Sequence, residues 1–300
     1  MWPAVRDNFM AFSEPLEGKV LWMYADQLGL VSIGIGNLID PVGLALALPS
    51  LGGPFSNKND PGAAVNDADI QADWTAVKTS GARAPASESL TALRISEQGC
   101  KQLVLTKVDK FESGLLNDAV DPATGVKAFA DFATWPADAQ LGLLSMSWAM
   151  GPDFAGPDSA GKGRWPAFRA ACASADWLAA AANCRIAGSY VSRNAVNRGL
   201  FRNAAWAVQQ ADFDAQVLFL PIGVTRPVLH QGDTDSGETT YVSDAQFFLS
   251  WLGYTVAQSG AFDSDTLTEV RQFQQDEGFP VTGNIGPLTW AALGYGVAPS

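Results

Sequence analysis

The stretch "EPLEGKVLWMYADQLGLVSIGIGN", from Glu14 to Asn37, joins two glutamates to an apolar segment, a turn and a glycine-rich segment. Residues 20–24 (VLWMY) and 30–36 (LVSIGIG) are rich in strand-forming side chains. Residues 26–29 (DQLG) between them are polar and end in glycine, as turns do. The sequence therefore predicts a β-hairpin that directly follows two carboxylates.

A helix is expected before this hairpin, because apolar side chains recur at three-to-four-residue spacing at Trp2, Val5, Phe9 and Phe12. Pro15 lacks an N–H, and its ring clashes with the carbonyl four residues earlier. The helix should therefore end or kink around Ser13.

Composition limits the possible functions. The chain has 300 residues, of which 47% are hydrophobic and 17% charged, with a net charge of −12 and a pI near 4.4. An acidic chain of this kind argues against nucleic-acid binding and against docking on an anionic membrane. From His230 onward nine acids and one arginine give a net charge of −8, which indicates a module boundary near that residue.

Targeting signals and membrane spans are not expected. The first 19 residues lack the basic and apolar segments of a secretory signal, and runs such as "VGLALAL" are too short to cross a bilayer. We expect a soluble protein made in the cytoplasm, without membrane insertion, that needs release or export to act elsewhere.

Cysteine and histidine usage limits the kinds of catalytic site that we expect in this chain. Cys100, Cys172 and Cys184 form no Cys-x-x-Cys motif, so buried free thiols are expected, with a Cys172–Cys184 bridge as the alternative. His230, the single histidine, lies in a polar stretch, which argues against histidine-based zinc or nucleophile chemistry. We expect no metal or cofactor, and any hydrolytic chemistry should depend on carboxylates.

The remaining chain is mostly helical in pattern. Residues 41–92 are rich in Gly, Pro, Ala, Asp and Asn, with possible helices at 69–78 and 88–93. Further helices are expected from Ser96 onward, at 137–151, within 166–184 and at 197–211. Residues 223–240 are predicted to be a linker, and three short helices are predicted at 244–254, 264–278 and 286–294.

The opening stretch resembles the phage-type lysozymes, a glycoside hydrolase family of small endolysins. The resemblance rests on Glu17-Gly18, Tyr24-x-Asp26, Gly29, Ser32 and Gly34-x-Gly36, without a gap. Fainter likeness continues in "AQLGLLSMSWAMG" and "NRGLFRNA". Three features depart from the family: Ser32 replaces a frequent Thr, Asn37 replaces an occasional His, and residues 41–92 are long.

This resemblance implies that Glu17 is the general acid and that Asp26 and Ser32 position a water for an inverting hydrolysis. Arg198 could then ion-pair with Glu17, although a surface role is the alternative; Glu14 has no counterpart in the family. Elementary chemistry agrees, because a partly apolar setting beside Leu16 would keep Glu17 protonated, whereas Asp26 at a turn would stay ionised.

The C-terminal stretch resembles three-helix peptidoglycan-binding modules. The resemblance rests on "LSWLGY", "SGAFDSDTLTEVRQFQQDEGFPVTGNIGPLTW" and "AAL". Leu249, Phe273 and Leu293 are expected in the core, and packing is also favoured for Tyr254, Phe262 and Trp290. The run "DSDTLTE" lacks the ligand spacing of a calcium loop, so Asp263 or Ser264 should cap a helix.

Together these patterns predict a mainly α (α+β) fold. A lysozyme-like catalytic domain with a small β-hairpin region should span 1–222, and a linker 223–240 should lead to a three-helix peptidoglycan-binding domain at 241–296. The expected function is an endolysin-type muramidase whose partner is bacterial peptidoglycan. The alternatives are a lytic transglycosylase and a non-catalytic wall-binding or virion structural protein, and an exported bacterial effector is the alternative to a phage enzyme.

Overall fold

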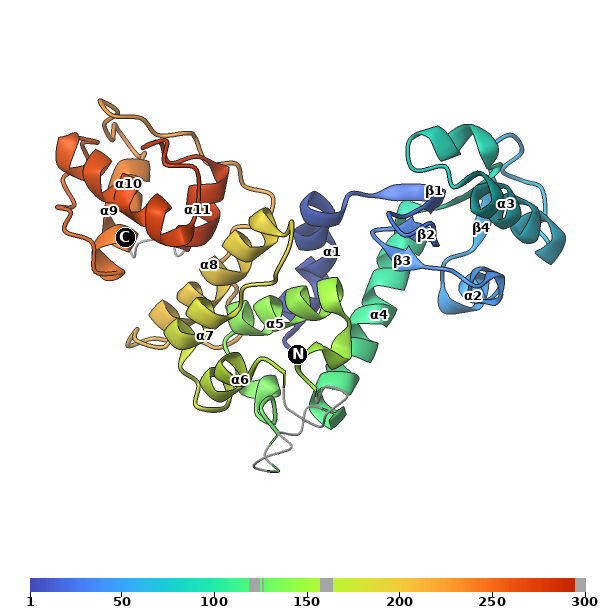
Figure 1. The fold of residues 1–300 in the computed structure, drawn as a ribbon, viewed down its shortest axis with the longest axis horizontal. Helices are drawn as coiled ribbons and strands as arrows, with labels where there is room; N and C mark the ends of the chain where they lie inside the picture. The colour runs from blue at the N-terminus through green and yellow to red at the C-terminus, as the bar shows by residue number, and fades with distance from the viewer. Residues whose placement is uncertain (119–124, 126, 157–163, 295–300) are drawn as a thin grey trace. The chain divides into compact units, whose positions relative to one another are not determined.

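The computed structural model describes residues 1–118, 125, 127–156 and 164–294 (Figure 1). The chain divides into two compact units, of which one comprises Met1–Arg6 with Phe111–Ser300 and the other Asp7–Lys110. We call the first the helical unit and the second the hairpin unit, and each is described by itself. The predicted mainly α fold with a small β region is confirmed.

The hairpin unit contains the predicted hairpin as part of a three-stranded antiparallel sheet. Strands β1 (Val20–Ala25), β2 (Val31–Gly34) and β3 (Asn37–Leu38) pair in the order β1-β2-β3. Tyr24 is the partner of Ser32 in this register, and the β1–β2 pairing is irregular between Val20 and Tyr24. The buried side of the sheet belongs to a core that includes Met23, Ile33 and Ile95.

Helix α1 (Pro3–Glu17) leads into this sheet and continues through Pro15. The prediction that the helix ends around Ser13 is therefore wrong. Pro15 removes one backbone donor only two residues before the helix ends. Gly18, with φ of 73°, ends the helix by donating its N–H to the Glu14 carbonyl at 2.8 Å. Glu17 is therefore the last helical residue.

Residues 41–92 form small elements around the sheet. In chain order these are α2 (Val42–Ala47), η1 (Leu48–Leu51), β4 (Phe55–Asn57), α3 (Asp67–Ser80) and η2 (Ala86–Leu90). The predicted helix at 69–78 is confirmed by α3, which Asn66 caps. The predicted helix at 88–93 is wrong beyond Leu90, because the chain then extends into β5 (Leu93–Ile95), which pairs with β4.

Helix α4 (Glu97–Asp118) begins at the predicted cap, where Ser96 Oγ accepts the Gly99 N–H at 2.9 Å. In the helical unit, η3 (Phe132–Thr134) precedes α5 (Ala137–Met150), which is buried over most of its length as predicted. After α5 follow η4 (Pro152–Ala155), α6 (Pro166–Ala173), α7 (Trp177–Asn183) and α8 (Val191–Ala207). Figure 1 shows α5 and α7 beside α8, consistent with their extensive contacts.

The three predicted C-terminal helices are present as α9 (Tyr241–Trp251), α10 (Ser264–Glu277) and α11 (Pro287–Leu293). Their shared core includes Phe248, Phe273 and Trp290, and it extends to Ala195 and Trp206 of α8. Gly199 makes this contact possible, because a Cβ there would lie 2.0 Å from the Ala291 carbonyl oxygen. The C-terminal helices therefore pack closely on α8.

The segment predicted as a linker, 223–240, is ordered against the same helices. Leu229 is buried and pairs with Ile285 through two backbone hydrogen bonds. The Pro227 carbonyl accepts the indole N–H of Trp290 at 2.8 Å, and Asp235 accepts the N–H groups of Val242 and Ser243 at the start of α9. Low apolar content suggested a linker, but the bonds to Ile285 and Trp290 and the contact with the start of α9 make the segment part of the C-terminal fold.

Candidate functional site

The hairpin gathers the predicted catalytic residues around one tyrosine. Ser32 on β2 pairs with Tyr24 on β1, and Tyr24 lies two residues before Asp26. The pKa of Tyr24 is raised by burial first, and then by the negative charges of Glu17 and Asp26. Both carboxylates must therefore lie near the Tyr24 ring. The structure thus brings Glu17, Asp26 and Ser32 together, although their catalytic roles are still predictions.

Asp26 is oriented by the turn that follows β1. Its Oδ1 accepts the N–H groups of Leu28 and Leu30 at 2.8 and 2.9 Å, and its own N–H donates to the Leu30 carbonyl at 2.8 Å. Gly29, with φ of 73°, provides the left-handed conformation that this turn needs. In the described part of the chain Oδ2 has no hydrogen bond, so one oxygen of a fixed carboxylate is available to a water or substrate.

The two glutamates of this stretch differ in their surroundings. Glu14 binds the Lys19 ammonium at 3.0 Å, and Lys19 also binds Glu97 at 2.9 Å. Glu17 is exposed, so burial does not supply the partly apolar setting predicted for it. The reason is its position as the last residue of α1, where the chain turns through Gly18 into β1.

Lys107 is a residue of this site that the sequence analysis missed. Burial lowers its pKa to about 8, while the charge of Glu17 acts in the opposite direction. Its Nζ donates to the Gly36 carbonyl at 3.3 Å, and the Gly36 N–H in turn hydrogen-bonds to Tyr24. An ammonium therefore lies near the predicted general acid. The signal was a lysine seven residues after Cys100, on the inward face of an amphipathic helix.

The Gly34-x-Gly36 motif packs against the same face of α4. A Cβ on Gly34 would lie 3.1 Å from Cys100 Sγ and 3.2 Å from Asn37 Nδ2. Gly34 and Gly36 also have φ of 68° and 78°, which favours glycine. Asn37 is buried, and its amide has no hydrogen-bond partner among the described residues. The motif therefore lets the end of the hairpin approach α4 closely.

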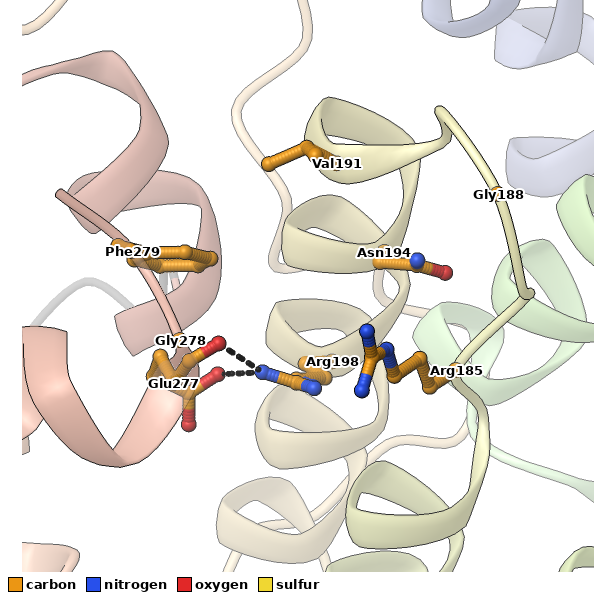
Figure 2. Close-up of a pocket in the computed structure, with 8 residues that line it drawn as sticks. All are labelled: Arg185, Gly188, Val191, Asn194, Arg198, Glu277, Gly278 and Phe279. Atoms are coloured by element: carbon orange, nitrogen blue, oxygen red, sulfur yellow. Dashed lines mark hydrogen bonds and ion pairs between the residues drawn. The ribbon is translucent and has the colours of Figure 1, made fainter.

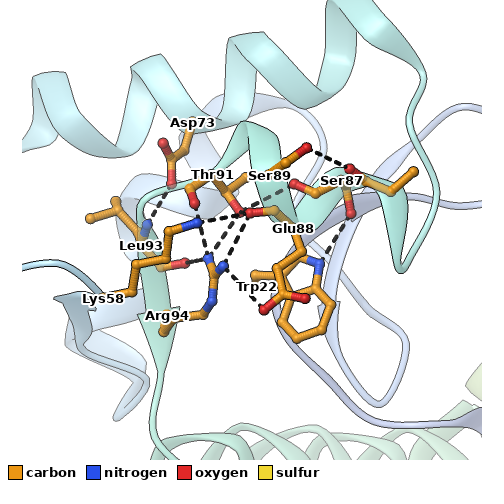
Figure 3. Close-up of polar contacts among 10 residues, drawn as sticks. Trp22, Lys58, Asp73, Ser87, Glu88, Ser89, Thr91, Leu93 and Arg94 are labelled. Carbon is orange, nitrogen blue, oxygen red and sulfur yellow. Dashed lines mark hydrogen bonds and ion pairs between the residues drawn. The ribbon is translucent and has the colours of Figure 1, made fainter.

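Residues 41–92 are fastened to the hairpin by polar contacts around Trp22 (Figure 3). The Trp22 indole donates to Ser87 Oγ at 3.1 Å, and the Arg94 guanidinium lies 5.1 Å from the centre of its ring. Arg94 also donates to the Glu88 carbonyl at 3.2 Å and to the Leu93 carbonyl at 2.7 Å. This network holds η2 and β5 on strand β1, which carries Tyr24.

Arg198 lies in the helical unit, where its guanidinium pairs with Glu277. Arg202 donates to the other Glu277 oxygen at 2.6 Å. The predicted pair between Arg198 and Glu17 joins the two units and stays a prediction. No local pattern pairs Arg198 with Glu277, because 79 residues separate them in the sequence.

The C-terminal aromatic side chains pack as expected. Phe262 and Trp290 are each 1% exposed, and Leu249, Phe273 and Leu293 are fully buried. Tyr254 donates its hydroxyl to Asp276 at 2.8 Å. Asp263 caps α10 by accepting the Thr266 N–H at 2.8 Å, which confirms the capping prediction. The three cysteines are buried free thiols, as the first of the two alternatives predicted.

Within residues 1–118, 125, 127–156 and 164–294, no helix has the length and hydropathy needed to cross a membrane. Over the same residues, His, Cys, Asp and Glu side chains form no group of three that could hold a metal ion.

Comparison with known proteins identifies the C-terminal domain. Residues 239–293 match the family described as "Putative peptidoglycan binding domain", which confirms the C-terminal part of the resemblance. Over 71 residues the chain is 34% identical to the "Uncharacterized protein in bpoA1 3'region" of Kitasatospora aureofaciens. That alignment covers 24% of this chain and 58% of the relative. The chain thus carries a peptidoglycan-binding domain, which supports peptidoglycan as its partner.

Proposed function

We propose that this chain is a peptidoglycan hydrolase that cleaves the β-1,4 bond between N-acetylmuramic acid and N-acetylglucosamine. The observation that carries the proposal is the gathering of Glu17, Asp26 and Ser32 around Tyr24. Cleaving a glycosidic bond needs an acid that protonates the leaving oxygen and a second carboxylate that directs the attacking group. A hairpin that follows a helix end supplies this pair within ten residues.

Each residue has a distinct role in this proposal. Glu17, exposed at the end of α1, protonates the glycosidic oxygen of the bound glycan. Asp26, fixed through Oδ1 by two backbone N–H groups, uses Oδ2 to take a proton from the attacking water, and Ser32 orients that water. Such a reaction inverts the anomeric centre. Proton NMR of the first product is expected to show the α anomer.

Lys107 acts on Glu17 through charge in this scheme. Its ammonium attracts the glutamate in the carboxylate form, which holds the side chain in place after it has given up its proton. Because the pKa of Lys107 is lowered to about 8, this attraction weakens at alkaline pH. Activity should therefore decline as the pH rises through 8.

The peptidoglycan-binding domain at 239–293 keeps the catalytic residues on insoluble substrate. Tethering raises the local substrate concentration, so even a weak contact increases turnover on intact walls. The acidic charge of this region makes an ionic contact with an anionic wall unfavourable, so wall binding should survive moderate salt. In the cell, the enzyme would reach the wall after release at lysis or after export.

One assay tests the proposal and separates its rivals. A suspension of purified peptidoglycan should lose turbidity on addition of the chain, and mass spectrometry should find products with reducing ends. Products one water lighter, with anhydro ends, would instead assign a lytic transglycosylase. A stable suspension in which the protein sediments with the wall would assign a non-catalytic wall-binding protein.

A further inference from the structure

A pocket lies where α8 meets the C-terminal helices (Figure 2). It has a volume of about 100 Å³ and is lined by Arg185, Gly188, Val191, Asn194, Arg198, Glu277, Gly278 and Phe279. All these residues belong to the helical unit. None of the hairpin residues described above is among the lining residues.

Most polar groups of this pocket are already engaged. The Asn194 amide bonds both the N–H and the carbonyl of Ile186 at 2.8 Å. The Glu277 carboxylate is shared by Arg198 and Arg202. These groups define the shape of the pocket but offer little to a ligand.

Arg185 is the exception. Its side chain is exposed and has no hydrogen bond or ion pair in the described part of the chain. Figure 2 shows its guanidinium beside that of Arg198, with Arg198 between it and Glu277. Among the lining residues Arg185 and Arg198 outnumber the single carboxylate of Glu277, so the lining is positive in a chain whose net charge is −12. The donors of Arg185 are therefore available to an anion.

Two apolar side chains also line the pocket, Val191 from α8 and Phe279 from the segment after α10. Phe279 presents its ring to the pocket, and Val191 is 50% exposed at its rim. A volume of about 100 Å³ accommodates roughly one small amino-acid residue. The pocket therefore suits an anion that carries a small apolar group next to its charge, which a carboxyl-terminal alanine does and a bare phosphate does not.

We propose that this pocket binds the terminal carboxylate of a short peptide that ends in a small residue. Arg185 would bind the carboxylate through two parallel N–H donors, and Val191 and Phe279 would contact the last side chain. That such a peptide comes from the stem peptides of the wall rests on the proposed function. The binding contact itself does not, because it involves none of the hairpin residues.

Calorimetry with the full chain tests this site without any need for catalysis. The probes are acetyl-D-alanyl-D-alanine, its carboxyl-terminal amide and inorganic phosphate. We expect the free acid to bind, the amide to bind at least about tenfold more weakly, and phosphate not to compete at equal concentration. Equal binding of acid and amide, or competition by phosphate at equal concentration, would overturn the assignment to a peptide carboxylate.

Two variants test whether the peptide binds in this pocket. Arg185→Gln should weaken acid binding about tenfold, and Val191→Asp should abolish it by charge repulsion; both side chains are exposed, so folding should be retained. Arg83→Gln removes the same charge from an exposed position of the hairpin unit and should change nothing. Unchanged binding in Arg185→Gln would contradict the proposal, even if the chain lyses walls as proposed.

Discussion

The hairpin and the contact between α8 and the C-terminal helices use charged side chains in opposite ways. In the contact on α8, Glu277 is enclosed by two arginines, and its carboxylate is only 7% exposed. In the hairpin, Glu17 is exposed and Asp26 keeps one oxygen without a hydrogen bond among the described residues. A carboxylate with two arginine partners fixes structure, whereas an oxygen such as Asp26 Oδ2 can contact a water or substrate.

The largest effect on stability is expected at Asp138, the most deeply enclosed carboxylate of the helical unit. It accepts the Asn203 amide at 2.8 Å and the N–H groups of Phe219 and Leu220 at 2.7 and 3.1 Å. Asp138→Ala leaves three donors without this acceptor, of which those of Asn203 and Leu220 are buried, so urea unfolding should show a loss of about 3–5 kcal/mol. A loss below about 1 kcal/mol would show that Asp138 is not structural in this sense.

The same residue predicts a pH dependence of stability. Burial raises the pKa of Asp138 from its ordinary value of 3.8 to about 7. Between pH 3.8 and 7 the folded state therefore keeps a proton that the unfolded state has lost. The stability that this proton contributes is complete below pH 3.8 and is lost as the pH rises through 7. Asp138→Ala should thus cost more stability at pH 5 than at pH 8. An equal cost at both values would contradict the raised pKa.

Removal of the C-terminal fold should separate wall binding from cleavage. A chain that ends at Ile222 keeps the hairpin residues and should still cleave soluble glycan fragments, but on intact walls it should act at least about tenfold more slowly. It should also melt at a lower temperature, because Ala195 and Trp206 lose their core partners. Lysis of walls at the rate of the full chain would contradict a tethering role.

The complementary fragment sharpens this comparison. A fragment from Val224 onward keeps Leu229 and Asp235 and should sediment with insoluble peptidoglycan without cleaving it. A fragment from Tyr241 onward lacks both residues and should unfold at a lower temperature. Identical melting of the two fragments would show that 224–240 is a linker after all.

Gly199→Ala is expected to disturb the contact on α8 alone. The added Cβ would lie 2.0 Å from the Ala291 carbonyl oxygen, so the helices must move apart, at a cost of about 1–3 kcal/mol. Gly43→Ala is the matched control, because α2 leaves open space at that position and alanine favours helices. Melting temperatures of both variants check this prediction, and an unchanged value for Gly199→Ala would contradict the close contact.

Replacement of Lys107 is expected to stabilise the fold, by less than the preceding variants destabilise it. Because burial lowers the pKa of Lys107 to about 8, its buried charge destabilises the fold at pH 7. This destabilisation decreases between pH 8 and 10.5, where the folded state loses the proton and the unfolded state still holds it. Lys107→Met should therefore raise the melting temperature by a few degrees at pH 7, and by less at pH 9.5. Its activity should be lower than that of the wild type at pH 7.

The control for this pair of effects is Lys110→Met, one turn further along α4 at an exposed position. It should change neither the melting temperature nor the activity. If Lys107→Met has full activity and an unchanged alkaline decline, Lys107 has no part in the reaction.

Local patterns predicted the hairpin well because its signals are short in range. Strand-forming runs, a glycine turn and the spacing of Glu17, Asp26 and Ser32 all lie within 16 residues. The end of α1 was missed because one lost hydrogen bond near a helix end does not stop the helix at Pro15. The order of segment 223–240 was missed because its partners lie up to 63 residues away.

The environment of the candidate site was harder to predict than its residues. Lys107 reaches Gly36 across 71 residues. Helical spacing places it on the same face as Cys100, but it does not indicate that this face meets the hairpin. Burial of Glu17 was inferred from apolar neighbours in sequence, but a residue at a helix end can point to solvent beside such neighbours. Tertiary packing decides both features, and neither is encoded in a local pattern.

The central claim is that Glu17, and not its neighbour Glu14, is the acid of a wall-degrading enzyme. Glu17→Gln and Glu14→Gln are compared with the wild type by the loss of turbidity of purified peptidoglycan, after circular dichroism has confirmed equal folding. Glu17→Gln should lower the rate at least about 100-fold, and Glu14→Gln, which loses only an ion pair with Lys19, should stay near the wild-type rate. Full activity in Glu17→Gln, or loss of activity in Glu14→Gln alone, would contradict the account.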